Sequence, residues 1–550
     1  MDNNIIKELR KKEEEDVAKV LSSKYKIPYL DISKITIDLD ALKVIPEKEA
    51  REKFVAVLQS VGKKLQIGVN NPEDQGVKNI LEQLKEKRYE ISLFLVSKSG
   101  LEKVFQKYAE VPRFEEIKAG IINISQAKIE TFGVSLHSIT SLKNSLENLI
   151  KQKESRKASE ALELMLAGAI SIEASDIHIE PESASVRLRL RLDGVLQNVT
   201  LIPLALYQLL LSRIKLISEV KLNVHDKPQD GRFTITTNSE NIEVRTSVLP
   251  GPYGESLVLR VLLPKNISKT IKDLGMHEHL REIIEVELKK PNGMILATGP
   301  TGSGKTTTLY AFLKKITTPE IKVVTIEDPI EYHIPYVTQT QVEPDKGYDF
   351  GNGLRSILRQ DPDVIMVGEI RDLDTAEIAM HASLTGHLVF STLHTNDAAG
   401  TIPRLIDIGV KTNIIAPAIN VTIAQRLVRK LCEACKQTVD ASPDETKIIV
   451  ENLKKIPKGY HRNIDTSFKI GKAAGCEECN KTGYKGRLGI FEAFLVDDAM
   501  ERLILQNPPE ADIKKAAKEQ GMMTMYQDGI LKIIDGVTSF DELQRVVSEE

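Results

Sequence analysis

An apolar run at residues 295–298 leads directly into the glycine-rich segment Gly299–Thr306, and a helical pattern follows it. The segment has the spacing G-x-x-x-x-G-K-[ST], between the strand and the helix that this motif requires. Its glycines let backbone N–H groups surround phosphate oxygens, and the following helix directs its positive end at the same anion. The alternative, a Gly/Ser-rich surface loop, does not account for a Lys-Thr pair after an apolar strand. The sequence therefore predicts a nucleotide-binding core around this segment.

The side chains of this loop have distinct expected roles. Lys305 can reach the outer phosphates, and the hydroxyl of Thr306 can hold Mg²⁺. The predicted phosphate-binding positions are Gly299, Pro300, Thr301, Gly302, Ser303, Gly304, Lys305, Thr306 and Thr307.

The size and charge of the chain bound the remaining possibilities. Its 550 residues correspond to three or four domains at about 150 residues each. A net charge of -3 with 28% charged residues favours neither a nucleic-acid nor a membrane partner. No apolar run approaches the roughly 18 residues that span a bilayer, and Met1-Asp2-Asn3-Asn4 leads into a charged helix rather than a signal peptide. We therefore expect a cytoplasmic protein.

The N-terminal part of the chain carries no visible catalytic cluster. Residues 1–110 combine an amphipathic helix around 17–21 with alternation at 65–69 that is typical of a strand. We interpret them as a small α/β docking or regulatory domain. Residues 111–155 are polar and weakly periodic, which predicts a linker.

A second globular unit is expected at residues 156–265. Residues 175–180 and 186–192 alternate polar with apolar residues, as paired strands with one wet face do, and Asp193-Gly194 supplies a hairpin turn. Three arginines, Arg187, Arg189 and Arg191, then project from one side of the second strand. They either form a solvated strand face or face a phosphate or an acidic neighbouring surface.

Further strands are predicted at 229–235, 244–249 and 258–262. A charged segment with helical periodicity, residues 265–290, then connects this β-rich unit to the nucleotide-binding core.

Acidic residues follow two β-branched runs of the core. Residues 323–326 end at Glu327-Asp328-Pro329-Ile330-Glu331, and residues 364–367 end at Gly368-Glu369. The carboxyl ends of parallel strands line the ligand crevice, so these carboxylates are expected to face the nucleotide. Gly368 stands where many P-loop enzymes have the Mg²⁺-binding aspartate, which leaves Glu369 to supply that carboxylate.

A third strand, residues 388–393, is followed by His394. A single histidine is more often structural than functional, but a polar residue at this place can sense the γ-phosphate. The strand context and His387, seven residues upstream, favour a functional interpretation of His394.

The four cysteines form two C-x-x-C pairs, Cys432 with Cys435 and Cys476 with Cys479. In a reducing compartment this pattern indicates metal before disulfide. Two pairs complete a tetrahedral Zn²⁺ shell without an open position, which makes the expected site structural. The separation of the pairs exceeds the common zinc-ribbon spacing, so four free thiols are the alternative.

Taken together, these segments resemble the signature boxes of the secretion ATPase superfamily. The resemblance is strongest to the type IV pilus assembly ATPases and the type II secretion ATPases, and it covers roughly residues 150–550. Its boxes are Gly299–Thr306, residues 327–331, residues 358–372 and residues 385–396, with residues 174–181 and Asp230-Gly231-Arg232 in the second unit.

The resemblance implies an α/β multidomain fold. A RecA-like P-loop NTPase core is expected at residues 266–550, with a tetracysteine zinc insert at about 430–482 and a C-terminal helical part. A mixed α+β, PAS-like domain that contributes arginines is expected before it at 156–265. Residues 1–110 resemble the N-terminal domain of these ATPases.

The resemblance also implies roles for individual side chains. The catalytic positions that it indicates are Arg245, Arg260, Glu327, Glu331, Glu369 and His394. The two arginines are expected to reach from the second unit toward the phosphates of ATP. Glu331, with Glu327 as the other candidate, is expected to orient or deprotonate the attacking water. Glu369 is expected to hold Mg²⁺, and His394 to monitor the γ-phosphate.

By the same resemblance, the expected assembly is a homo-hexamer. It would act on an inner-membrane platform protein, with an accessory cytoplasmic ring protein, at the inner face of the membrane. Retraction ATPases of the superfamily generally lack the tetracysteine insert, so we expect a motor for pilus assembly, with type II secretion as the alternative.

Near-neutral charge and the lack of a basic tract argue against a nucleic-acid translocase. The full set of acidic boxes argues against a scaffold that binds ATP without turnover. The N-terminal segment has no Arg-Leu-Gly motif, so cyclic di-GMP binding is not expected.

Overall fold

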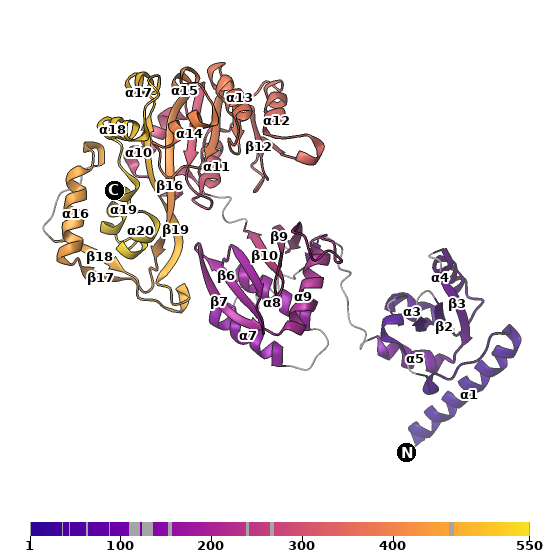
Figure 1. Cartoon of the computed structure of the whole chain (residues 1–550). Helices are drawn as coiled ribbons and strands as arrows, with labels where there is room; N and C mark the ends of the chain where they lie inside the picture. Colours follow the sequence, from indigo (N-terminus) through magenta and orange to yellow (C-terminus); the bar gives the residue numbers. More distant parts are fainter. Residues whose placement is uncertain are drawn as a thin grey trace. The chain divides into compact units, whose positions relative to one another are not determined.

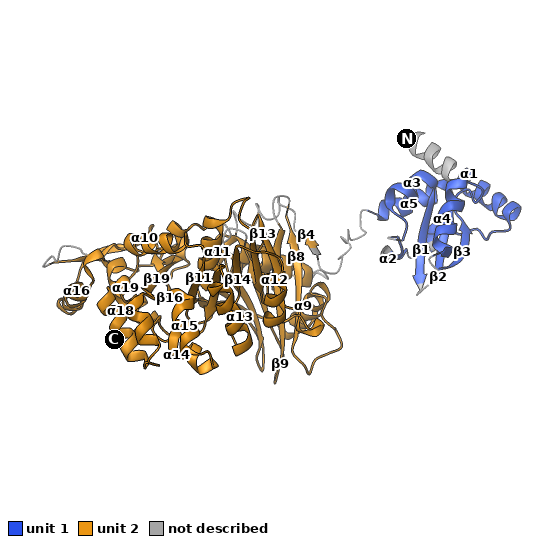
Figure 2. Cartoon of the chain, turned by 90° about the horizontal axis from the view of Figure 1, so that it is seen from above, with its two compact units in different colours: residues 1–117 blue, residues 118–550 orange. Residues whose placement is uncertain are grey.

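The computed structural model describes residues 2–35, 37–42, 44–61, 64–86, 89–108, 121–123, 136–151, 157–237, 241–263, 269–460 and 467–548. The chain forms two compact units, residues 1–117 and 118–550 (Figure 2).

The first unit is a small α/β domain with a three-stranded sheet. The strands β1 (Val55–Val61), β2 (Lys64–Val69) and β3 (Glu90–Leu95) lie in the order β1-β2-β3. The helices are α1 (Asp2–Tyr25), α2 (Leu39–Leu42), α3 (Glu47–Lys53), α4 (Gln75–Glu86) and α5 (Lys98–Lys107). The strand predicted at 65–69 and the helix predicted around 17–21 are both confirmed, as β2 and as part of α1.

The second unit begins with a seven-stranded sheet in the order β4-β8-β9-β10-β5-β6-β7. Its strands are β4 (Ile121–Asn123), β5 (Asp176–Pro181), β6 (Val186–Leu192), β7 (Val195–Ile202), β8 (Gln229–Thr236), β9 (Asn241–Gly251) and β10 (Gly254–Leu262). Helices α7 (Ile139–Lys151), α8 (Lys157–Ser171) and α9 (Leu204–Ile217) pack on one another and on this sheet. The hairpin turn predicted between β6 and β7 is confirmed, with φ of 47° at Asp193 and 84° at Gly194.

The prediction of a linker at 111–155 is wrong for two segments. β4 pairs with β8, and α7 is a helix that buries Leu142, Leu146 and Leu149 on one face. The polar residues between these leucines hid the narrow apolar stripe, because they dominate the average composition. Residues 111–120, 124–135 and 152–155 of the predicted linker lie outside the described residues.

The arginines of β6 face acidic neighbours. Arg187 pairs with Glu182 at 2.6 Å, Arg189 with Glu180 at 2.5 Å, and Arg191 with Asp176 at 3.2 Å. Of the alternatives for this row, the structure supports the acidic neighbouring surface, and part of that surface is the adjacent strand β5.

The predicted nucleotide-binding core is a second seven-stranded sheet in the order β13-β12-β14-β15-β11-β16-β19. The ladders are parallel except for that between β16 and β19. Its strands are β11 (Gly293–Thr298), β12 (Val323–Glu327), β13 (Val337–Gln341), β14 (Val364–Val367), β15 (Leu388–Leu393), β16 (Ile419–Leu431) and β19 (Tyr484–Leu495). The predicted strands at 323–326, 364–367 and 388–393 are confirmed.

Helices cover both faces of this sheet, with α10 (Glu278–Glu287) and α11 (Lys305–Ile316) on one side. The other side carries α13 (Leu373–Leu384), α14 (Thr401–Ile408) and α15 (Thr412–Ala418) (Figure 2). Strands β11, β14 and β15 are buried throughout, as the continuous apolar runs of a covered parallel sheet require. The same arrangement brings the carboxyl ends of these strands to one edge.

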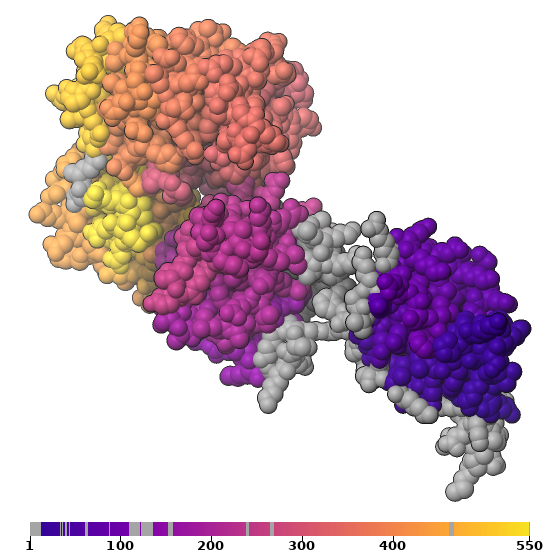
Figure 3. Space-filling view, turned by 45° about the vertical axis from the view of Figure 1, so that its right-hand side comes forward, coloured from indigo at the N-terminus to yellow at the C-terminus, as the bar shows by residue number. Residues whose placement is uncertain are grey.

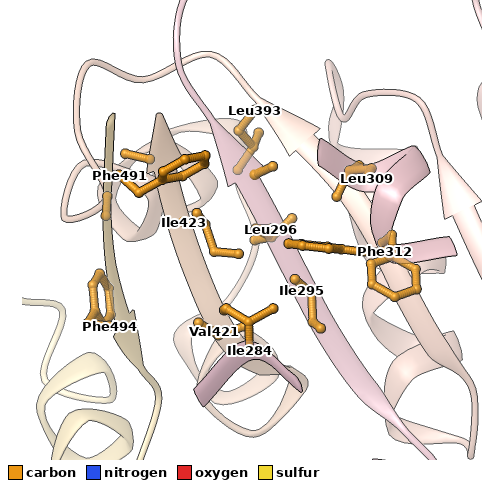
Figure 4. Packing of buried hydrophobic residues seen from close by; sticks show 14 of the residues in the cluster. Ile284, Ile295, Leu296, Leu309, Phe312, Leu393, Val421, Ile423, Phe491 and Phe494 are labelled. Carbon is orange, nitrogen blue, oxygen red and sulfur yellow. The ribbon is translucent and has the colours of Figure 1, made fainter. Parts of the chain in front are cut away.

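One apolar cluster fixes α11 against the sheet. Side chains of α10, α11 and the central strands point into it (Figure 4). Phe312 of α11 is fully buried, and its ring lies 6.4 Å from that of Phe390 on β15. The helix that begins with Lys305 therefore has a defined position relative to β11.

The C-terminal part of the chain closes one end of the core (Figure 1). Between β16 and β19 lie β17 (Gln437–Asp440), α16 (Pro443–Lys455) and β18 (Lys469–Lys472), and β17 pairs with β18. After β19 come α17 (Asp498–Ile504), α18 (Glu510–Gln520), α19 (Met525–Ile534) and α20 (Phe540–Val546).

The remaining helix, α12 (Phe350–Leu358), packs on β12 and α13. In the described part of the chain, no helix has the length and hydropathy needed to cross a lipid bilayer.

Candidate nucleotide-binding site

The loop between β11 and α11 has positive φ angles that glycine adopts readily and other residues rarely do. Gly299 has φ of 143°, and a Cβ there would lie 2.6 Å from the carbonyl oxygen of Gln425. Gly304 caps α11 with φ of 94°. The loop therefore curls tightly over the carboxyl end of β11 and leads into the positive end of α11, as anion binding requires.

Two polar groups of the loop suit a phosphate ligand. Lys305 Nζ donates to the carbonyl oxygens of Gly299 at 2.7 Å and Pro300 at 3.3 Å, so the ammonium group lies over the loop. Burial lowers the pKa of Lys305, and the charge of Glu369 partly opposes this shift. Ser303 Oγ is buried and has no hydrogen-bond partner among the described residues. The loop thus offers an anion one hydroxyl without a partner among the described residues and one cation.

A residue on a neighbouring strand, which the sequence analysis did not identify, forms a hydrogen bond with the loop. Gln425 of β16 donates from Nε2 to the carbonyl oxygen of Ser303 at 2.7 Å. It is only 1% exposed although its side chain is an amide. That single buried amide was the only available signal, and it could not be assigned to the loop without the pairing of β11 with β16.

The two candidate base residues have different surroundings. Both carboxylate oxygens of Glu327 are engaged, because Thr325 Oγ1 donates to it at 2.5 Å, Gln339 Nε2 at 3.0 Å, and the hydroxyl of Tyr310 donates as well. Glu327 is 2% exposed. Glu331 instead lines a cavity beside the loop, where its carboxylate stays accessible to water although protein atoms surround it.

The environment of Glu331 favours its protonated form more than water does. The surrounding protein atoms partly desolvate the carboxylate of Glu331 and raise its pKa, and the charge of Glu327 adds to this effect. Arg245, Arg260 and a hydrogen bond with Thr306 oppose the rise. A carboxylate with a raised pKa is a stronger base, so Glu331 has the properties of a proton acceptor.

Glu369 and His394 are brought together at the ends of neighbouring strands. His394 Nε2 lies 3.2 Å from Glu369 Oε2, and Arg371 also forms an ion pair with Glu369. A Cβ at Gly368 would lie 3.3 Å from the carbonyl oxygen of Ile326, so the close approach of β12 favours glycine there. The carboxylate of Glu369 and the hydroxyl of Thr306 are hard oxygen donors of the kind that Mg²⁺ prefers.

Two arginines of the first seven-stranded sheet, one on β9 and one on β10, line the same cavity. Arg245 donates to the carbonyl oxygen of Ile330 at 2.6 Å, and Arg260 donates from Nε to Asp176 at 3.0 Å. The cavity has a volume of about 240 Å³ and lies between these arginines, Glu331 and the start of α11. Leu274, Leu427 and Phe491 add apolar wall, which suits the base of a nucleotide.

The cysteines form a separate cluster, and no cysteine is among the described residues that line the cavity. Their four Sγ atoms lie within 4.8 Å of one another. The separations are 3.9 Å for Cys432 and Cys476, 3.8 Å for Cys435 and Cys479, and 3.7 Å for Cys476 and Cys479. Zn–S bonds of about 2.3 Å in a tetrahedron place sulfur atoms about 3.8 Å apart. The cluster therefore fits a zinc ion.

Backbone amides also prepare one of these sulfurs for a metal. The N–H groups of Cys476 and Gly483 donate to Cys479 Sγ at 3.1 and 3.2 Å. Burial would raise the pKa of Cys479, but these hydrogen bonds, together with those from the thiols of Cys476 and Cys435, outweigh it and lower the pKa to about 7. Thiolate is the form that binds zinc.

Comparison with known proteins gives the family. A sequence profile described as "Type II/IV secretion system protein" matches residues 151–545, and one described as "MshEN domain" matches residues 25–114. The "Type IV pilus assembly ATPase PilB" of Pseudomonas aeruginosa is 35% identical over 97% of this chain and 91% of its own length. The "Type II secretion system ATPase E" of Vibrio cholerae is 42% identical over 73% of this chain and 78% of its own length.

A solved structure shows the same fold. The crystal structure of the Legionella pneumophila ATPase DotB matches 72% of this chain and 97% of its own with a TM-score of 0.51, at 22% identity. The family profile covers strands β5 to β10 of the first seven-stranded sheet and the core with its phosphate loop. The chain therefore belongs to the Type II/IV secretion system protein family.

Proposed function

We propose that the chain is an ATPase that drives type IV pilus assembly. The observation that carries the proposal is the cavity in which the start of α11 meets Glu331, Arg245 and Arg260. The candidate base and the arginines that phosphoryl transfer requires line this cavity, and the phosphate loop with its cation, Lys305, meets it at Gly304. The pilus assembly relative, similar along nearly its whole length, agrees with this function.

In the proposed reaction, the amides of the loop and Lys305 bind the phosphates of ATP. Glu331 orients the attacking water and accepts its proton, which its raised pKa favours. Arg245 and Arg260 stabilise the charge that develops on the transferring group. Thr306 and Glu369 would hold Mg²⁺, which neutralises phosphate charge when bound.

We further propose that His394 reports the state of the γ-phosphate through Glu369. The two side chains are in contact at 3.2 Å. The Thr298 and Thr395 hydroxyls, 2.6 Å apart, tie the segment after His394 to the end of β11. A displacement at the phosphate site would therefore be felt in the loop after β15.

Pilus assembly is preferred to type II secretion because of coverage. The pilus assembly relative aligns with 97% of the chain and the type II secretion relative with 73%. Deleting the gene in its source organism should remove surface pili, and wild-type protein should restore them where Lys305→Ala does not. Loss of protein secretion with normal pili would favour type II secretion instead.

The proposed assembly follows the same comparison. We infer a cytoplasmic homo-hexamer, peripheral on the inner face of the cytoplasmic membrane, that acts on an inner-membrane platform protein with an accessory cytoplasmic ring protein.

For residues 156–265 we propose a PAS-like fold. One antiparallel meander, β5-β6-β7, is followed by helix α9 and a second meander, β8-β9-β10, and β10 pairs with β5. No role for nucleic acid is proposed, and cyclic di-GMP is not proposed as a ligand.

For the tetracysteine cluster we propose a structural zinc site. Purified, freshly reduced protein should contain about one zinc ion per chain, because four thiolates leave no coordination position open. Elemental analysis of the full-length protein measures this ratio. Cys476→Ser should lower it well below one, since serine is a poor zinc ligand.

Lys485→Ser provides the matched control for that measurement. Lys485 is exposed and lies near the cluster, but it offers no thiol. The control should retain the wild-type zinc content. Wild-type protein free of zinc after reduced purification would disprove the metal site.

A further inference from the structure

The box at residues 174–181, which includes strand β5, has a buried carboxylate that none of the proposed steps uses. Asp176 has a side chain that is 6% exposed. Its carboxylate accepts from Arg260 Nε at 3.0 Å, lies 3.2 Å from Arg191 Nε, and accepts from Ser175 Oγ at 2.8 Å. One buried acid thus lies between two guanidinium groups.

The strand register produces this arrangement. β5 lies between β10 and β6, and Asp176 is directly opposite Arg260 on one side and Arg191 on the other. Directly opposite residues have neighbouring side chains, so the pairing of oppositely charged groups follows from the register itself. Figure 3 shows the surface of this part of the chain (magenta) beside the surface of the core (orange).

The contact through Nε leaves the outer part of Arg260 available. The guanidinium has five N–H donors, and Asp176 receives the one on Nε. Among the described residues, Arg260 has no hydrogen-bond partner other than Asp176, and its side chain is 60% exposed and lines the cavity with Glu331. Asp176 itself does not line that cavity.

We propose that Asp176 is a positioning residue that directs the terminal amino groups of Arg260 toward the phosphates of a bound nucleotide. This inference rests on the proposed ATPase function of the cavity. A long arginine side chain loses conformational freedom when it binds a ligand, and an anchor that restricts it beforehand reduces that loss. Arg191 pairs with the same carboxylate, so the buried Asp176 has two cationic partners rather than one.

The test is a double-mutant cycle on the affinity of the full-length protein for a non-hydrolysable ATP analogue with Mg²⁺. Asp176→Asn keeps the size of the side chain and removes its charge, and it should weaken binding by about 10-fold. In an Arg260→Ala background the same substitution should have no further effect, because Asp176 acts through Arg260. Glu180→Gln, which alters the partner of Arg189 on the same strand, should bind within about twofold of wild type.

Two results would overturn the inference. One is wild-type affinity in Asp176→Asn, and the other is an equal loss with and without Arg260, which would indicate a general effect on the sheet. Wild-type protein that binds no analogue would instead disprove the proposed function, and the inference with it.

Discussion

Replacing Lys305 with alanine is expected to lower the rate of ATP hydrolysis by at least about 100-fold while the protein stays folded. Lys305 is the loop's own cation, and its ammonium group lies over the carbonyl oxygens of Gly299 and Pro300. Transition-state charge on the phosphoryl oxygens would lose that partner. The measurement is phosphate release by purified wild-type and variant protein at saturating Mg²⁺ and ATP.

Lys314→Ala is the matched control for this substitution. Lys314 is an exposed lysine in the last turn of the same helix, α11. Its removal should leave turnover within about twofold of wild type, because an exposed charge far from the ligand is screened. A Lys305→Ala protein that hydrolyses ATP at more than a tenth of the wild-type rate would contradict the assignment of the phosphate loop.

Replacing Glu331 with glutamine should lower kcat by about 10²- to 10⁴-fold, the usual contribution of a general base. Glutamine keeps the shape of the side chain but cannot accept a proton. The wild-type rate should fall as the pH drops through the raised pKa of Glu331, because only the carboxylate acts as a base. That acid limb should be absent in the variant, and a pH profile of single-turnover hydrolysis measures it.

Glu327→Gln should have the opposite pattern. Tyr310, Thr325 and Gln339 all donate to Glu327, so the substitution disturbs a buried network and lowers the free energy of unfolding by about 1–3 kcal/mol. Thermal unfolding detects this loss, while hydrolysis by the folded fraction should persist. If Glu331→Gln hydrolyses ATP normally and Glu327→Gln does not, the base is Glu327.

The phosphate loop was predictable from sequence because its parts are contiguous. One strand, one turn and one helix supply every group, and the glycine spacing reports the backbone directly. Glu327, Glu369 and His394 could also be placed at one sheet edge, because each follows a recognisable buried strand. The partners of these side chains could not be predicted, because they lie on other parts of the chain. Gln339 of β13 donates to Glu327, and Glu369 contacts both Arg371 and His394.

Long-range pairing decided what the sequence left open. The cysteine pairs are 44 residues apart, yet Leu431 of β16 lies opposite Tyr484 of β19, so the chain leaves and re-enters the sheet at one place. Gln425 and Asp176 likewise depend on which strands are neighbours. Periodicity identifies a strand and its wet face, but it does not give the register that joins Asp176 to Arg260.

The most direct test of the central claim is an experimental structure of the full-length protein with Mg²⁺ and a non-hydrolysable ATP analogue. The triphosphate should lie on the amides of residues 302–306, with Lys305 on the outer phosphates and Glu331 facing the γ-phosphate. An analogue bound elsewhere, with this loop and the cavity beside it free of ligand, would contradict the account.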